Sequence, residues 1–317
     1  MSPNRREFIS TLAAAGAALP FISSTGNDVS EPPVEKFPLR LFSKPLDAYD
    51  FGFMCEVTSA AGLGGFDLTI RKGGKVEPAE IDVKLPGLIK TAKDHKLAID
   101  MMVTDVVNTT DPLTEKVLKT ASASGITHYR MGYLEFDYSK GIWESLQKYK
   151  ADFKNVADLN IKYNLRGGYQ NHAGTRVGGP VWDLYELVKD LTPGPIGVQY
   201  DVRHAMVEGF NAWVPGLRLL NKYVNTIAIK DYTWKVVKQK PEPVTVPMGE
   251  GLVNWDTFFK IVKELNISGP ITLHVEYPLL EKEEAALPLD KQKEIITAKI
   301  RKDVDFLKAY LVKYQLA

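Results

Sequence analysis

The 317-residue chain contains a single cysteine, Cys55, and this scarcity limits the sites that it can build. One thiol forms no intrachain disulfide and no multi-cysteine metal centre, so any metal would be held by oxygen and imidazole ligands. We expect Cys55 to be a small buried apolar residue.

The chain also lacks an excess of either charge. It has 40 basic and 39 acidic side chains and a formal net charge of +1. Without a large basic face to neutralise phosphates, we expect no nucleic-acid partner. A content of 44% hydrophobic and 25% charged residues is ordinary for a soluble globular protein and excludes a disordered, collagen-like or coiled-coil chain.

No apolar run at the N-terminus is long enough to span a bilayer, because Thr11 to Ile22 falls short of the roughly 20 residues needed. Arg5 and Arg6 before this run resemble a twin-arginine export signal. We therefore expect residues 1–24 to be an export signal, residues 25–37 to be a linker, and the mature protein to be periplasmic without stable membrane insertion. A frayed N-terminus and an uncleaved signal anchor remain alternatives.

From residue 38 to residue 317, short β-rich runs alternate with amphipathic stretches, which predicts a parallel sheet. The predicted strands are Leu39–Phe42, Gly65–Arg71, Leu97–Thr104, Thr127–Tyr133, Leu165–Asn171, Ile196–Val202, Thr226–Asp231 and Ile271–Tyr277. Predicted helices include Leu85–His95, Trp143–Tyr163, Val181–Leu191, Trp213–Tyr223, Trp255–Leu265 and Asp290–Tyr314. Eight such units favour a single-domain α/β fold, the (βα)8 TIM barrel. An open doubly wound sheet is the alternative, weakened because no Gly-x-Gly-x-x-Gly turn follows the first strand.

Polar side chains gather at the predicted strand ends, where a barrel of this type builds its functional site. They are Arg71, Thr104, Asp105, Gln170, Asn171, His172, Asp201, Arg203, His204, Lys230, Asp231, His274 and Glu276. Because side-chain direction repeats every two residues along a strand, His274 and Glu276 are expected on one face. A strand needs no polar residue at its end for stability, so this set predicts a site.

The same segments resemble the xylose isomerase-like sugar isomerase and epimerase barrels. The matching segments are Tyr169–Gly174, Gln199–Ala205, Ala228–Asp231, Val246–Trp255 and His274–Tyr277. They occur in the family's order through the second half of the chain, and the Pro-x-Gly-Glu-Gly loop beginning at Pro247 is the most specific of them. The resemblance implies a (βα)8 barrel that acts on a small-molecule carbohydrate.

The resemblance also implies one divalent cation, Mn, Mg or Zn, bound by Glu, Asp, His and Glu at the ends of strands five to eight. Carried over position by position, these ligands fall on Gln170, Asp201, Ala228 and Glu276. A neutral amide replaces one carboxylate, and a methyl group replaces the imidazole, so the metal site is altered. If a cation is retained, we expect Asp201 and Glu276 to hold it together with Gln170 or a histidine. A protein without any cofactor is the alternative.

The altered site leaves a small set of candidate residues. We expect Glu276, His172, Lys230 and His204 to be catalytic, with the Lys230 ammonium standing in electrostatically for the metal. We expect Arg71, Arg203, Trp234 and Glu250 to bind substrate. The competing interpretation makes Asp201 and Glu276 a structural salt bridge with Arg203 or Lys230 and gives Lys230 an easy partner in Asp231. His274 is interpreted as a core histidine and Lys235–Lys240 as a solvated loop.

These residues predict an enzyme that abstracts a proton next to the carbonyl of a sugar or keto-sugar, giving isomerisation, epimerisation or β-elimination. Elimination suits the altered site best, because it proceeds with one base and one electrophile. A non-catalytic carbohydrate-binding barrel that has lost its metal site is the main alternative. A glycoside hydrolase using Asp201 and Glu276 is another. A homodimer is left open, since such barrels often pair.

Overall fold

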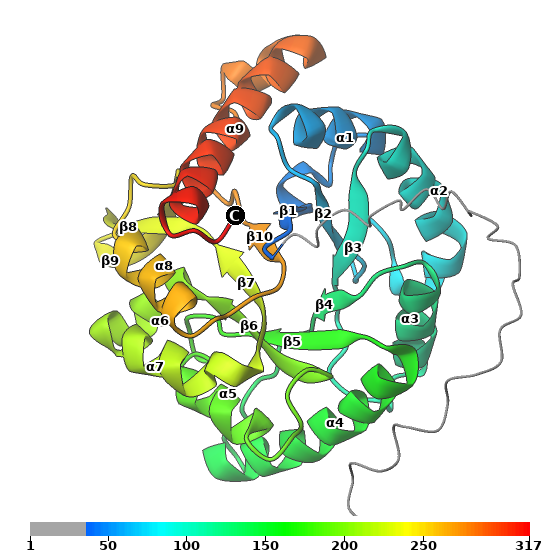
Figure 1. The fold of residues 1–317 in the computed structure, drawn as a ribbon, viewed down its shortest axis with the longest axis vertical. Helices are drawn as coiled ribbons and strands as arrows, with labels where there is room; N and C mark the ends of the chain where they lie inside the picture. The colour runs from blue at the N-terminus through cyan, green and yellow to red at the C-terminus, as the bar shows by residue number, and fades with distance from the viewer. Residues whose placement is uncertain (1–35) are drawn as a thin grey trace, which may run out of the picture. The chain divides into compact units, whose positions relative to one another are not determined.

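The computed structural model describes residues 36–317, in which eight parallel strands close into a barrel (Figure 1). The barrel strands are β1 (Leu39–Phe42), β2 (Gly65–Thr69), β3 (Ala98–Val103), β4 (His128–Arg130), β5 (Arg166–Gln170), β6 (Ile196–Asp201), β7 (Val224–Ile229) and β10 (Ile271–Leu273). Each pairs in parallel with its neighbours, and β10 closes the ring between β7 and β1. The predicted single-domain (βα)8 barrel is therefore confirmed, and all eight predicted strands are present, most of them one to several residues shorter than predicted.

Helices surround these strands, as Figure 1 shows. They are α1 (Phe51–Ala60), α2 (Ile81–Asp94), α3 (Pro112–Ala123), α4 (Ile142–Tyr163), α5 (Val181–Val188), α6 (Val202–Gly209), α7 (Trp213–Leu220), α8 (Trp255–Glu264) and α9 (Leu289–Lys313). Within residues 36–317, none of them combines the length and the apolar composition that crossing a bilayer requires. Cys55 lies fully buried in α1, as expected.

Side-chain caps begin several of these helices. Asp50 accepts a hydrogen bond from the Gly52 amide at the start of α1, and Asn254 accepts one from the Thr257 amide at the start of α8. Such caps satisfy amide groups that have no partner within the first helical turn. These capping hydrogen bonds define where α1 and α8 begin.

The alternation along each strand separates an apolar outer layer from a polar interior. On β2, Phe66 and Leu68 belong to the core between strands and helices, while the intervening Asp67 is fully buried on the opposite face. Further polar side chains on the interior faces have exposures of at most 1%; these are Thr69, Gln199, Thr226 and Thr272. The inside of the barrel below its mouth is therefore lined by polar side chains. Barrels of this type usually place branched apolar residues there.

An antiparallel hairpin follows β7 and corrects one sequence interpretation. Strands β8 (Asp231–Val237) and β9 (Lys240–Val246) include the Lys235–Lys240 stretch that was expected to be a loop. Lys238 and Gln239 form its turn with φ angles of 48° and 65°, the left-handed values that a tight hairpin requires. The sequence lacks the Asn-Gly signal for such a turn, which is why the hairpin was missed.

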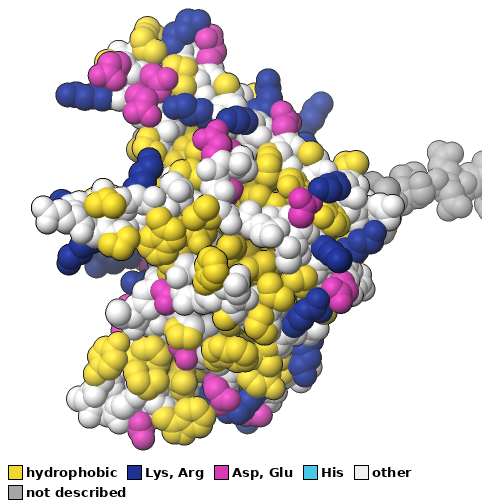
Figure 2. Space-filling view, turned by 90° about the vertical axis from the view of Figure 1, so that its left-hand side faces the viewer, with side chains coloured by type: hydrophobic (Ala, Val, Ile, Leu, Met, Phe, Trp, Pro, Cys, Tyr) yellow, Lys and Arg dark blue, Asp and Glu magenta, His cyan; other side chains and the backbone are white. Residues whose placement is uncertain are grey.

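The side of the barrel that carries this hairpin is shown in Figure 2. Hydrophobic side chains gather over its middle and lower parts, whereas charged side chains of both signs gather at its upper end. Trp234 and Val236 on β8 are 46% and 78% exposed.

The expected export signal, residues 1–24, lies outside the described residues, as does the linker up to residue 35. At the end of that expected linker, Phe37 is only 1% exposed. The amide of Ile271 donates to the carbonyl oxygen of Pro38. The chain is thus already attached to the barrel at Phe37.

Candidate active site

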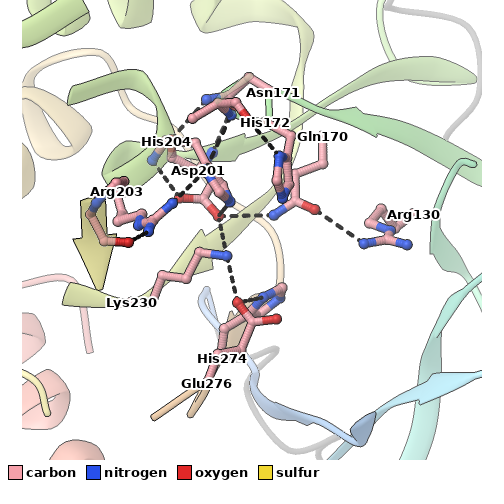
Figure 3. Close-up of polar contacts among 12 residues, drawn as sticks. Arg130, Gln170, Asn171, His172, Asp201, Arg203, His204, Lys230, His274 and Glu276 are labelled. Carbon is pink, nitrogen blue, oxygen red and sulfur yellow. Dashed lines mark hydrogen bonds and ion pairs between the residues drawn. The ribbon is translucent and has the colours of Figure 1, made fainter. Parts of the chain in front are cut away.

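The carboxyl ends of the strands bring most of the predicted site residues together at one mouth of the barrel (Figure 3). The gathered side chains are Gln170, His172, Asp201, Arg203, His204, Lys230, His274 and Glu276. They come from the ends of β5, β6, β7 and β10 and from the first turn of α6. Parallel strands in a closed barrel place these ends side by side, although the residues are far apart in sequence.

Lys230 lies at the centre of this group. Its Nζ atom is 2.7 Å from Oε2 of Glu276 and 3.3 Å from Oδ2 of Asp201, and its side chain is 3% exposed. Burial alone would lower the pKa of Lys230, but the two carboxylates raise it above its usual value. Burial acts in the opposite direction on Glu276 and raises its pKa. The charge of Lys230 and its hydrogen bond outweigh burial and lower this pKa to about 2. The site therefore holds a charged Lys230 ammonium against an ionised Glu276, with Asp201 on its other side.

Asp201 is fully buried, and both of its carboxylate oxygens are occupied. Oδ1 accepts from the backbone amide of His204 at 3.0 Å and so caps α6, while Oδ2 accepts from Nε2 of Gln170 at 2.8 Å. Asn171 exchanges a reciprocal pair of 2.8 Å hydrogen bonds with the Asp201 backbone. Asp201 thus positions its neighbours and, being fully buried, cannot reach a substrate as an acid or base.

Gln170 is oriented by groups on both sides of its amide. Its Oε1 accepts from the hydroxyl of Tyr133 at 2.6 Å and from Nη1 of Arg130 at 3.2 Å. Because the carboxylate of Asp201 demands a donor, Nε2 must point toward it. The amide oxygen is therefore already committed and offers little to a cation.

These residues do not fit the resident divalent cation that the family resemblance implies. In the part of the chain that the structure describes, no group of three or more His, Cys, Asp or Glu side chains is arranged to hold a metal ion. Ala228 supplies no ligand, and the two carboxylates considered as ligands converge on the ammonium of Lys230 (Figure 3). We derive no catalytic step through a metal.

Two histidines in contact, His172 and His204, lie beside this ion group, with ring centroids 3.8 Å apart and ring planes inclined at 34°. Nδ1 of His172 lies 2.9 Å from the carbonyl oxygen of Ala173, to which it can only donate, so its Nε2 is left as an acceptor. Nδ1 of His204 receives hydrogen bonds from Nη1 of Arg203 and the amide of Ala173, so its proton is on Nε2. Burial lowers the pKa of both imidazoles, that of His204 well below its usual value. The pair therefore offers one neutral acceptor and one neutral donor.

His274 agrees with its interpretation as a core histidine. It stacks on Phe42 with ring centroids 4.4 Å apart and is 2% exposed. Burial holds its pKa well below the usual value. Its Nδ1 lies 3.9 Å from Oε2 of Glu276, which places both side chains on one face, as the alternation predicts.

Arg203, predicted to bind substrate, is used within the protein. Its Nη2 donates to the carbonyl oxygen of Pro243 at 2.9 Å, and its guanidinium lies 5.6 Å from the ring centroid of Tyr232. Both contacts are with the hairpin β8–β9. Arg203 therefore joins the start of α6 to the hairpin and orients His204.

Two other predicted substrate contacts lie on the surface. Glu250 is exposed and pairs with Lys302 at 2.5 Å, and Trp234 projects from β8. Arg71 follows β2, is half-buried, and makes no side-chain hydrogen bond among residues 36–317. Of the four predicted substrate-binding residues, Arg71 alone is neither exposed nor held by a side-chain hydrogen bond in the described chain.

The glycine-rich loop that carries the family resemblance is organised by Asp231. Its carboxylate accepts from the amides of Gly249, Gly251 and Val253 and from the indole of Trp255. A Cβ atom at Gly251 would lie 2.1 Å from Oδ1 of Asp231, so only glycine fits there. Asp231 is therefore turned away from Lys230, contrary to the pairing that the sequence suggested.

Two residues of the site were not among the sequence predictions. Arg130 ends β4 and is 4% exposed, and Tyr133 lies three residues later with its ring 4.7 Å from the Arg130 guanidinium. Both lie in the predicted strand Thr127–Tyr133, whose end carried no motif of the family. A polar residue at this strand end, as at the others, was the available signal.

Comparison with known proteins identifies the family. A family model described as the xylose isomerase-like TIM barrel matches residues 55–310. The chain belongs to this family. No curated protein sequence matches it significantly.

Solved structures of xylose isomerase-like barrels share the fold at low sequence identity. A D-allulose 3-epimerase from Methylomonas sp. has a TM-score of 0.64 at 12% identity, with 87% of this chain and 99% of that chain covered. A D-psicose 3-epimerase from Clostridium cellulolyticum H10, solved with D-tagatose, has a TM-score of 0.62 at 11% identity, with coverages of 86% and 99%. The IolI protein with a bound zinc atom has a TM-score of 0.66 at 15% identity, with coverages of 88% and 99%. These likenesses establish the fold, whereas the chemistry depends on the site.

Proposed function

We propose that this barrel is a carbohydrate-acting enzyme of the isomerase, epimerase or lyase type, which removes a proton from the carbon next to a carbonyl group. Its family membership and the sugar epimerases among its structural neighbours support the substrate class. The observation that carries the mechanism is the buried ammonium of Lys230, fixed by Glu276 and Asp201 at the mouth.

In this mechanism Lys230 is the electrophile. As Nε2 of His172 accepts the proton from carbon, the electrons of that C–H bond form a C=C bond and the carbonyl oxygen becomes an enolate. The ammonium stabilises the developing negative charge, and its low exposure strengthens that interaction. The Nε2–H of His204 is buried 3.7 Å from Oδ2 of Asp201 and supports that carboxylate beside Lys230.

The presence of a single free base favours β-elimination or isomerisation over two-base epimerisation. Lys230 lowers the pKa of Glu276 to about 2, which makes its carboxylate a weak proton acceptor, and Asp201 is fully buried, so neither offers an effective second base. In elimination, the carbonyl re-forms while the enolate's C=C electrons make a double bond to the next carbon and expel its leaving group. The leaving oxygen takes up the proton that His172 removed. The same burial of Asp201 argues against the glycoside hydrolase alternative.

The test is hydrogen exchange in D2O. A panel of keto-sugars and keto-glycosides is incubated with the enzyme, and NMR follows loss of the α-hydrogen signal together with any alkene or isomer product. We expect exchange that is reduced at least about 100-fold in Lys230→Met and in His172→Gln, a loss of roughly 3 kcal/mol of transition-state stabilisation. The surface variant Trp182→Phe is the matched control and should exchange at the wild-type rate.

A non-catalytic carbohydrate-binding barrel is the competing function. It would show sugar-dependent thermal stabilisation with no exchange for any substrate of the panel. That result would refute the proposed chemistry and leave binding as the function.

We also propose export by a twin-arginine-type signal to the periplasm, supported by Arg5 and Arg6 before the short apolar run. Fractionation of cells that express the full chain, compared with an Arg5→Lys, Arg6→Lys variant, tests it. Equal distribution of both proteins in the cytoplasm would refute the proposal.

A further inference from the structure

Two arginines on the β2 and β4 side of the mouth have no acidic partner. Arg130 is 4% exposed; its Nη1 donates to Tyr133 and Gln170, and its Nε is buried without any partner. Arg71 is half-buried and makes no side-chain hydrogen bond. Across residues 36–317, no Asp or Glu oxygen lies within 4.0 Å of either guanidinium.

The two guanidiniums also lie close enough to repel each other. Burial lowers the pKa of Arg71, and the charge of Arg130 is the next largest cause of that lowering. A buried cation without a counter-charge is costly, and two together are more so. An arrangement of this kind is expected where a ligand brings the compensating negative charge.

None of the acidic groups around the mouth pairs directly with either guanidinium. Glu276 and Asp201 are both committed to Lys230, and Asp105 accepts from the backbone amide of Lys72 at 2.7 Å. Asp67, deeper in the barrel, has its pKa raised to about 7 by burial, so it carries only part of a charge at neutral pH. Asp105 and Asp47 raise the pKa of Arg71 through space, but neither forms an ion pair with it, so the donors of the Arg71 fork stay free.

Tyr133 connects this side of the mouth to the proposed base. Its ring lies between the guanidiniums of Arg130 and Arg176, at 4.7 and 4.6 Å from its centroid, and packs edge-on against His172 at 5.2 Å. A group bound by Arg130 would thus hold the rest of a sugar next to His172 and Lys230. Binding and chemistry would share one continuous surface.

We propose that Arg71 and Arg130 bind an anionic oxygen group of the substrate, a carboxylate or a phosphate, so that the enzyme acts on an acidic sugar. This inference rests on the proposed function, since it specifies the substrate of the same site. The planar fork of each guanidinium suits two oxygens of such a group.

Binding is measured by titration calorimetry at low ionic strength, with D-glucuronate, D-glucose 6-phosphate and D-glucose as probes. We expect at least about tenfold tighter binding of one anionic probe than of D-glucose, and weakening of that binding in added salt. Preference between glucuronate and glucose 6-phosphate distinguishes the carboxylate from the phosphate. Arg71→Gln should lower the affinity for the anionic probe about tenfold and leave the affinity for D-glucose unchanged.

Two further variants separate binding from folding. Arg130→Lys keeps the charge but loses the planar fork, and it should weaken anion binding with the thermal midpoint preserved. Arg166→Gln, at the opposite end of the barrel on β5, is the control and should bind like the wild type. Equal affinity for all three probes, or unchanged anion affinity in Arg71→Gln, would overturn the inference. If the α-hydrogen of neutral keto-sugars exchanges with D2O but no anionic probe binds, this inference alone is refuted. If an anionic probe binds but no α-hydrogen exchanges, the proposed function alone is refuted.

Discussion

At the scale of single residues, Lys230 decides how the mouth of the barrel works. Its ammonium pairs with two carboxylates. In the described chain, the only other basic side chains within salt-bridge distance of them are His204 and His274, whose pKa burial holds well below the usual value. A change at Lys230 must therefore affect stability as well as chemistry.

We expect Lys230→Met to destabilise the fold by about 3–5 kcal/mol, because removing one member of a buried ion pair leaves the others uncompensated. The pKa of Glu276 should rise from about 2, since the Lys230 charge no longer lowers it. Denaturant unfolding and NMR titration of the Glu276 carboxyl measure both effects. Lys230→Arg keeps the charge and serves as the control; an unshifted Glu276 pKa in Lys230→Met would contradict the assignment.

Asp67 gives the fold a pH dependence at the same scale. Burial raises its folded-state pKa from 3.8 to about 7, so between these pH values the native state binds its proton more tightly than the unfolded state does. This contribution therefore makes stability fall as pH rises through that window, by at most about 1.4 kcal/mol per pH unit.

Asp67→Asn carries no titrating proton and should lose this slope, so its stability relative to the wild type should be greater at pH 8 than at pH 5. Chemical denaturation at both pH values measures the difference. The exposed Asp158→Asn is the matched control and should keep the wild-type slope. Identical pH profiles for Asp67→Asn and the wild type would show that Asp67 does not titrate in this range.

At the scale of elements, one carboxylate organises the connection from the hairpin β8–β9 to α8. Asp231 accepts from three backbone amides of residues 249–253 and from the Trp255 indole, and only a glycine fits at position 251. This explains why the glycine-rich loop is such a specific sequence feature without giving Glu250 a catalytic role.

We expect Asp231→Ala to destabilise the protein by about 2–4 kcal/mol, because several buried donors would lose a charged acceptor. Hydrogen exchange should increase at the amides of Gly249, Gly251 and Val253 and remain unchanged on β3. Glu250→Gln, which removes only an exposed ion pair, is the control with an expected change below about 1 kcal/mol. Similar stabilities for the two variants would contradict the structural role given to Asp231.

At the scale of the whole molecule, the ion group around Lys230 predicts that divalent cations do not change the stability of the protein. A ligand that binds only the native state raises the unfolding free energy in proportion to the logarithm of its concentration. We expect neither chelator nor added Mn²⁺ or Zn²⁺ to shift the thermal midpoint, and elemental analysis to find less than stoichiometric metal. One equivalent of metal, lost in Asp201→Ala and Glu276→Ala, would show instead that Lys230 gives way to a cation.

Much of this architecture was predictable, because its signals are local and periodic. The β/α alternation predicted the closed barrel, and the polar strand ends predicted that Gln170, Asp201, Lys230 and Glu276 would meet. The hairpin was not predictable from its Lys-Gln turn, which lacks the usual glycine. Arg130 was overlooked because nothing along the chain shows that a buried strand-end arginine will lack an acidic partner.

The sequence by itself determined the family, the order of strands and helices, and the side of each strand on which a residue lies, since all of these follow from spacing along the chain. Only the tertiary structure decided which charge faces which. It placed Lys230 between Glu276 and Asp201, turned Asp231 into the neighbouring loop, and left Arg71 and Arg130 without a direct ion-pair partner in the described chain. Charges interact through distance in space and through burial, and both are fixed only when strands far apart in sequence close into one barrel.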